Sequence, residues 1–198
     1  MKSNELVFDY SEKVINVPAS SCNDSEQFID INRFANLEEL IIGMNSFMKV
    51  NTIHIDNRDK LKNILIHAQS FFTPVNSQLR GSFVVSNCKQ LETITIDYLS
   101  CVHFCNDFVL LNLPSLKTLQ IGQIGKYSTN FFHMSLCLRG DFYSTHTLSL
   151  DLPSLESVVL GDEVFQFSLN TVFEGSFSSN APIQIFLLSE QSSWASKR

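Results

Sequence analysis

Apolar residues recur in one fixed pattern along the chain. Five six-residue segments carry apolar side chains at their first, fourth and sixth positions, and all fifteen of these positions obey the pattern. These hexamers are 37–42, 61–66, 91–96, 116–121 and 155–160. Side chains alternate between the two faces of an extended strand, so the fourth and sixth positions point to the same side. Each hexamer is therefore predicted to be a short strand with one buried edge.

The spacing of the hexamers indicates a repeat. Their starts lie 24, 30, 25 and 39 residues apart, which gives a basic period of about 24 to 25 residues, in the range typical of stacked repeats. The last interval is one period with an excess of about 14 residues; this excess includes 132–143 and a strand-like stretch at 135–138. We call a hexamer together with the residues up to the next hexamer a unit.

A second apolar stretch precedes most hexamers and is predicted to be another strand. It occurs at 53–55, 83–85, 108–110 and, slipped by one residue, 148–150. A short polar residue stands four positions before the repeat leucine in each case, where its side chain can bond a turning backbone. These expected turn residues are Asn57, Asn87, Asn112 and Asp151.

Phenylalanine marks the loop that follows the hexamer. Phe47, Phe71 and Phe165 each stand ten residues after the first hexamer position. In the third and fourth units that position is Cys101 and Lys126. A lysine side chain does not fill an apolar slot, so we expect longer, irregular loops in which Phe104 and Phe131 lie a few residues further on.

The chain resembles the leucine-rich repeat family, and in particular its BspA-like and protist forms. The resemblance covers roughly 28–176 and rests on the hexamers, on the Ser-Phe pairs 46–47 and 70–71, and on the Leu-Pro-Ser-Leu phrases at 113–116 and 152–155. It implies a β-rich solenoid, a right-handed coil with parallel sheets and little helix, that serves as a scaffold for binding proteins and has no catalytic residues. We expect an N-terminal cap over 1–27, the solenoid over 28–177, and a C-terminal cap or tail over 178–198.

Composition and charge argue against several classes of function. The chain has 198 residues, 44% hydrophobic and 17% charged, with a net charge of −6, which suits one compact domain and argues against a surface that binds nucleic acid. There is no apolar run long enough to span a membrane and no secretory signal pattern. We therefore expect no membrane span and a cytoplasmic location.

The hexamers also place candidate binding residues. Their fifth positions are predicted to point out of the sheet and to form an exposed ladder: Ile41, Leu65, Thr95, Gln120 and Val159. Exposed aliphatic side chains on a sheet can form a binding patch. The alternative is that the segments flanking the repeats cover this ladder.

The second hexamer positions alternate in charge from one unit to the next: Glu38, Lys62, Glu92, Lys117 and Glu156. Neighbouring strands lie about 4.8 Å apart, so these side chains can stack as a salt-bridge ladder that favours the register. We expect them to support register and solubility.

No pattern points to a cofactor, a metal or a catalytic site. Cys101, His103 and Cys105 have no second matching pair of ligands, as structural zinc would require, and buried free thiols are the simpler interpretation. Phosphate-loop, dinucleotide, nucleophile-elbow and zinc-protease motifs are missing. A β-helix carbohydrate enzyme would need several acids on one face, whereas Asp97 and Asp162 fall in units that are not neighbours.

The sequence therefore predicts a non-enzymatic module that binds a protein partner. Two alternatives remain open. The chain can be an adhesive surface repeat from a larger exported protein, or a β-helix enzyme that acts on carbohydrate.

Overall fold

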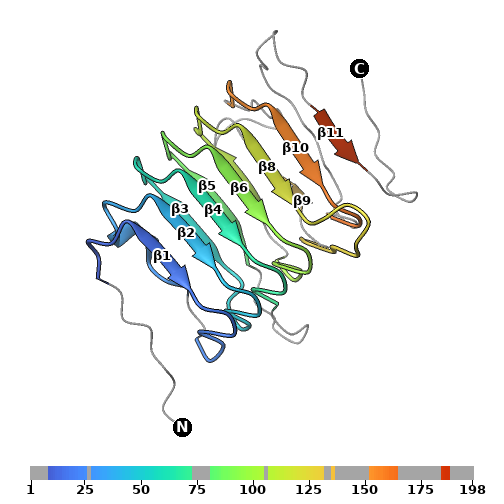
Figure 1. The fold of residues 1–198 in the computed structure, drawn as a ribbon, viewed down its shortest axis with the longest axis horizontal. Coiled ribbons are helices and arrows are strands. Elements are labelled where there is room, and N and C mark those ends of the chain that lie inside the picture. The colour runs from blue at the N-terminus through green and yellow to red at the C-terminus, as the bar shows by residue number, and fades with distance from the viewer. Residues whose placement is uncertain are drawn as a thin grey trace.

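The computed structural model describes residues 9–25, 28–72, 81–104, 107–131, 135–136, 152–164 and 184–187 (Figure 1). These residues form short strands and one 3₁₀ helix, Ile31–Arg33. The strands are β1 (Val14–Val17), β2 (Glu39–Ile42), β3 (Ile53–Asp56), β4 (Asn63–Ile66), β5 (Phe83–Ser86), β6 (Thr93–Ile96), β7 (Asp107–Leu111), β8 (Thr118–Ile121), β9 (Ser135–Leu136), β10 (Ser157–Leu160) and β11 (Gln184–Leu187).

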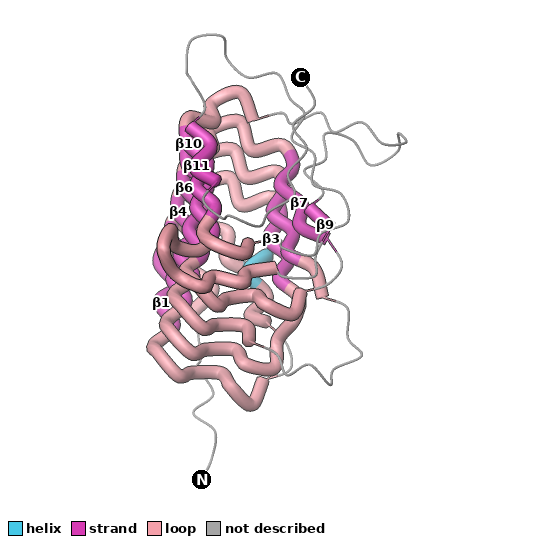
Figure 2. The backbone as a smooth tube through the Cα atoms, turned by 90° about the vertical axis from the view of Figure 1, so that its right-hand side faces the viewer, coloured by secondary structure: helices cyan, strands magenta, loops and turns pink. Residues whose placement is uncertain are grey.

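The strands form two sheets, and every strand pairing is parallel. Sheet A has the order β1-β2-β4-β6-β8-β10-β11, and sheet B has the order β3-β5-β7-β9. From β2 to β10 the chain visits sheet A and sheet B in turn, and the two sheets lie on opposite sides with the turns between them (Figure 2). The expectation of a strand-rich fold with parallel sheets and little helix is confirmed for the described residues.

The five hexamers supply consecutive central strands of sheet A. Their fourth positions are register partners from strand to strand: Leu40, Ile64, Ile94, Leu119 and Val158. At the first, fourth and sixth hexamer positions no side chain is more than 7% exposed. The apolar pattern therefore faces the core, as predicted.

The second apolar stretch forms sheet B where the structure describes it. β3, β5 and β7 coincide with the predicted strands, and β9 matches the start of the strand-like stretch at 135–138. The predicted strand at 148–150 lies outside the described residues. Asn57, Asn87 and Asn112 each follow a strand of sheet B and have a left-handed backbone, with φ between 51° and 54°, which confirms them as turn residues.

The side chains of the turn asparagines do not bond the turning backbone as predicted; among the described residues they bond polar side chains, in part across units. Asn87 donates to Asp56 Oδ1 at 2.8 Å, and Asn112 donates to Asn87 Oδ1 at 2.8 Å. Ser86 Oγ also donates to Asp56 Oδ1 at 2.6 Å. Partial burial raises the pKa of Asp56, but the hydrogen bonds from Ser86 and Asn87, together with smaller contributions from His54 and the Asn57 N–H, hold this pKa below its ordinary value. The carboxylate is thus a fixed acceptor between two units.

Sheet A begins and ends with strands that the hexamer pattern missed. β1 lies within 1–27 and β11 within 178–198, the two segments assigned to caps. β1 pairs in parallel with β2, and Ile15 and Val17 are buried like the hexamer residues. Glu12 stands 25 residues before Leu37, where the other units have an apolar residue, and this hid the strand.

The loops after the first four hexamers repeat an unusual backbone conformation; Phe165, the phenylalanine predicted for the fifth, lies outside the described residues. Two residues with positive φ flank one residue between them, and the second of the two is Phe47, Phe71, Cys101 or Phe131, with φ from 52° to 56°. Non-glycine residues seldom adopt this conformation. Phe131, not Lys126, takes the phenylalanine place of the fourth unit. Five additional residues, Lys126 among them, precede Phe131. They form an outward loop, so Lys126 does not occupy the apolar slot that the spacing assigned to it.

Serine hydroxyls bind these loops to one another. Ser70 Oγ donates to the carbonyl of Gly43 at 2.8 Å and accepts from the backbone N–H of Ser46 at 3.3 Å. Ser46 Oγ makes the same pair of bonds one unit earlier, to Pro18 and from Ser21. The middle residue of the strained loop thus satisfies buried backbone groups in its neighbour, which offsets the cost of the positive φ.

Aromatic rings fill the core between the loops. Phe47 and Phe71 stack with centroids 5.3 Å apart, and Phe71 meets Phe104 edge to face at 6.2 Å. Phe104 in turn contacts Phe131 at 6.1 Å, and Phe131 contacts Phe108 at 5.0 Å. The rings therefore connect the units in a continuous column. Phe104 packs in the third unit, where Cys101 takes the phenylalanine place.

Removing one ring of this column should destabilise the fold. We expect Phe71→Ala to lower the free energy of unfolding by about 3–5 kcal/mol, because it leaves a cavity in the core. The adjacent Phe72 is 37% exposed and its ring meets that of His103, so Phe72→Ala is the matched control and should cost clearly less than Phe71→Ala. Urea denaturation measures both, and equal losses would contradict this packing.

The serine bonds give a second test. Ser70→Ala leaves the Gly43 carbonyl and the Ser46 N–H without their partner, and we expect a loss of about 1–3 kcal/mol. Ser154 is half-buried and makes no hydrogen bond with the described residues, so Ser154→Ala should change stability by less than about 0.5 kcal/mol. A Ser70→Ala protein as stable as the wild type would show that the hydroxyl contributes nothing.

Candidate functional site

The outer face of sheet A is the surface on which the predicted binding ladder lies. The fifth hexamer positions are register partners in consecutive strands: Ile41, Leu65, Thr95, Gln120 and Val159. The structure thus brings all five into one row. Each side chain is half-buried, because the neighbouring strands flank it on both sides.

A polar row runs beside the ladder at the third hexamer positions. It consists of Glu39, Asn63, Thr93, Thr118 and Ser157, which are also half-buried. Asn63 Nδ2 donates to Glu39 Oε1 at 3.3 Å, and Thr93 Oγ1 donates to Asn63 Oδ1 at 2.8 Å. Side-chain hydrogen bonds therefore fix this row across three strands, and the ladder of fifth positions lies next to it.

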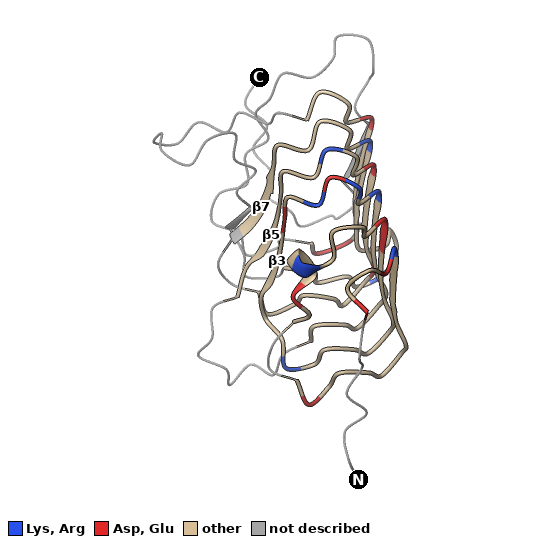
Figure 3. Cartoon of the chain, turned by 90° about the vertical axis from the view of Figure 1, so that its left-hand side faces the viewer, with Lys and Arg blue, Asp and Glu red and all other residues tan. Residues whose placement is uncertain are grey.

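The row of alternating charges begins one unit earlier than the sequence suggested and is paired only in part. Glu38 lies 2.9 Å from both Lys13 and Lys62, and Lys117 lies 3.1 Å from Glu92. Between the described residues, no ion pair within 4.0 Å joins Lys62 to Glu92 or Lys117 to Glu156. Figure 3 shows the alternation of basic and acidic residues along this edge.

Glu38 is the most strongly affected carboxyl group of the row. The hydrogen bond from Lys62, together with the hydrogen bond and positive charge of Lys13, lowers the pKa of Glu38 from its ordinary value of 4.5 to about 2. Glu38 correspondingly raises the pKa of Lys62. The pair of lysines thus keeps this carboxylate ionised into acid solution.

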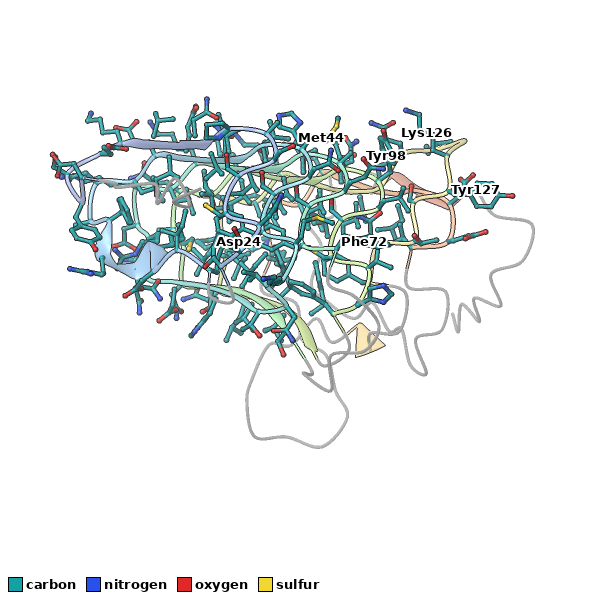
Figure 4. The ribbon with its side chains drawn as sticks, turned by 90° about the horizontal axis from the view of Figure 1, so that it is seen from below. Asp24, Met44, Phe72, Tyr98, Lys126 and Tyr127 are labelled. Carbon is teal, nitrogen blue, oxygen red and sulfur yellow. The ribbon has the colours of Figure 1, made fainter. Side chains whose placement is uncertain are left out.

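The turns after the sheet A strands form a rim that sequence reasoning did not assign. His67 Nδ1 lies 3.3 Å from Asp97 Oδ2, and the Lys126 ammonium lies 4.6 Å from the centre of the Tyr98 ring. Met44 and Tyr127 are exposed on the same rim, as Figure 4 shows with Tyr98 and Lys126. The one signal in the sequence was the disturbed spacing around Lys126.

The candidate metal-binding residues and the cysteines can be placed only in the part of the chain that the structure describes. No three side chains of His, Cys, Asp or Glu gather there to hold a metal ion. Cys88 and Cys101 are buried free thiols; burial raises the pKa of Cys88 to about 11 and that of Cys101 well above its ordinary value. Cys105, from the candidate zinc segment, lies outside the described residues.

The acids considered for a carbohydrate enzyme follow strands that are not neighbours in sheet A. Asp97 follows β6 and Asp162 follows β10, and β8 lies between these strands in sheet A. Among the described residues, no helix has the length and apolar character needed to cross a membrane.

Comparison with known proteins does not assign the chain to a family. A scan against protein-family models, a search of curated proteins and a search of solved structures each return no match.

The lowered pKa of Glu38 predicts a specific pH dependence. A carboxyl group whose pKa falls on folding stabilises the protein above its ordinary pKa, and this contribution disappears as the pH falls through the folded value. We expect Glu38→Gln to lower the melting temperature near pH 6, with a difference from wild type that shrinks below pH 4.5 and vanishes near pH 2. Thermal unfolding at a series of pH values measures it.

Glu156→Gln is the control, because Glu156 occupies the same position in its hexamer but has no ion-pair partner within 4.0 Å among the described residues. Its effect on the melting temperature should be smaller near pH 6. A Glu38→Gln effect that is constant from pH 6 to pH 2 would contradict the assignment.

Proposed function

We propose that this chain is a leucine-rich-repeat solenoid that binds a protein partner through the outer face of sheet A and has no catalytic role. The observation that carries the proposal is the alignment of five fifth-position side chains in one half-buried row across consecutive parallel strands. A row that is apolar at Ile41, Leu65 and Val159 and polar between them offers contact area and hydrogen bonding together.

The repeated geometry supports the solenoid part of the proposal. Each unit returns the chain to sheet A beside the preceding unit, and equivalent loop residues take the same positive φ. The same serine-to-carbonyl hydrogen bond recurs at Ser46, Ser70 and Ser100. Stacked repeats of this kind build extended binding surfaces, because each unit adds one strand to a common face.

The anatomy of the face supports the binding part. Protein interfaces combine apolar with polar contact area, and here the partly apolar ladder lies between the polar row and the rim with its aromatic residues. Seven strands, at about 4.8 Å apart, span about 29 Å. That length is comparable with the side of a standard interface, which buries about 800 Å² on each partner.

The experiment is a pull-down from native lysate with mass-spectrometric identification, comparing wild type with Ile41→Asp/Leu65→Asp/Val159→Asp. Proteins bound through this face should be depleted at least tenfold by the variant, because three carboxylates replace its apolar contacts. Circular dichroism and thermal unfolding establish that the variant is folded.

The matched control adds three carboxylates to the outer face of sheet B, as His54→Asp/Val84→Asp/Leu111→Asp. The control should retain the proteins that the sheet A variant loses. Recovery of the same proteins with both variants would show that sheet A is not the recognition surface.

A further inference from the structure

The fourth unit carries an insertion of five residues, 123–127. In the first three units the residue whose carbonyl accepts a backbone N–H from the preceding unit lies two positions after the hexamer: Met44, Ala68 and Tyr98. In the fourth unit that residue is Ser128, whose carbonyl accepts the N–H of Leu99 at 2.7 Å. Ser128 lies seven positions after Ile121, so 123–127 are additional to the repeat.

The insertion contributes nothing to the core. Residues 124–127 are exposed, whereas Phe131 fills the phenylalanine place after the insertion. The repeat therefore needs no side chain from the insertion to fold, and its presence calls for another explanation. Loops that a rigid scaffold holds in place commonly carry recognition residues.

The insertion is nevertheless held firmly. Ser128 Oγ donates to the Gln123 carbonyl at 3.1 Å and accepts from the Gln123 N–H at 2.9 Å. The Gly125 N–H donates to Asp162 Oδ1 at 3.3 Å, and Tyr127 forms a parallel bridge with Asp162. The backbone lies so close to Gly161 that a Cβ there would come within 2.4 Å of Gln123 N.

This anchored loop presents large apolar side chains to solvent. Tyr127 is 76% exposed and Ile124 is 43% exposed. A tyrosine on a preorganised backbone gives up little conformational freedom on binding and is a frequent source of interface energy. The Lys126 ammonium is directed at the Tyr98 ring, and the two side chains that follow β10, Asp162 and Glu163, are acidic.

We propose that the insertion loop 123–127 is the principal contact for a polypeptide segment that combines apolar with basic side chains. Its apolar residues pack on Ile124 and Tyr127, and its Lys or Arg residues face Asp162 and Glu163. The proposal rests on the protein-binding role proposed above and assigns the strongest contact to the loop beside sheet A. Asp162 then has two tasks, because it anchors the loop through one oxygen and attracts the partner by its charge.

The probe is a library of random 16-residue peptides displayed on phage, panned against the full chain with the deletion variant lacking 123–127 as soluble competitor. The deletion joins Gly122 to Ser128 and restores the spacing of the other units, so we expect it to fold. Enriched peptides should carry aromatic or aliphatic residues together with Lys or Arg. Failure to enrich any peptide over the competitor would overturn the proposal.

Point variants measure the same contact without shortening the chain. For enriched peptides made synthetically, Tyr127→Ala should weaken binding at least tenfold, whereas Met44→Ala, an exposed apolar residue elsewhere on the rim, should change it less than twofold. Asp162→Asn keeps the acceptor for Gly125 and should reduce both the affinity and its salt dependence. Equal effects of Tyr127→Ala and Met44→Ala would overturn the proposal.

The triple aspartate variant of the sheet A ladder separates this proposal from the proposed function. Peptides that lose affinity for that variant but bind Tyr127→Ala normally would overturn the loop proposal and leave sheet A as the recognition surface. Peptides unaffected by either change would contradict both. Peptides that depend on Tyr127 support the loop as the principal contact.

Discussion

Parallel pairing between equivalent positions of successive units is the constraint on which the rest of the structure depends. Because register partners belong to the same apolar class, as in Leu40, Ile64 and Ile94, each strand buries its side chains against matching side chains of the strands beside it. The loops must then return the chain to the same place each time. They do so with positive φ, and serine hydroxyls and stacked phenylalanines stabilise that conformation.

The sequence predicted the elements whose signal is burial. The hexamers and the strands of sheet B were found because their inward positions are apolar, and the turn asparagines because a short polar residue recurs four positions before the repeat leucine. β1 was missed because Glu12 stands in the leucine position, and β11 because the C-terminal segment lacks the full pattern. A strand that carries only part of the pattern is recognised by the strand with which it pairs, and this pairing cannot be read from the sequence.

The candidate site was predictable to a similar extent. Alternation along a strand placed the outward ladder on sheet A, and register aligned it. Ion pairing in the charge row depends on the conformations of long side chains. Glu38 pairs with two lysines, whereas Glu156 has no ion-pair partner within 4.0 Å among the described residues. The rim was not predictable in this way, because it depends on where five additional residues leave the stack. Lys126 marked the place, but its contact with Tyr98 did not follow from spacing.

The most direct test of this account is solution NMR of through-space contacts between backbone protons in sheet A. In-register parallel stacking predicts contacts that link Leu65 with Thr95 and Thr95 with Gln120, their register partners. These contacts define the ladder on which the proposed binding face depends. Contacts displaced by one residue would place the ladder residues on the opposite face of the sheet. If no contacts joined these strands, the ladder would not form. Either result would contradict the account.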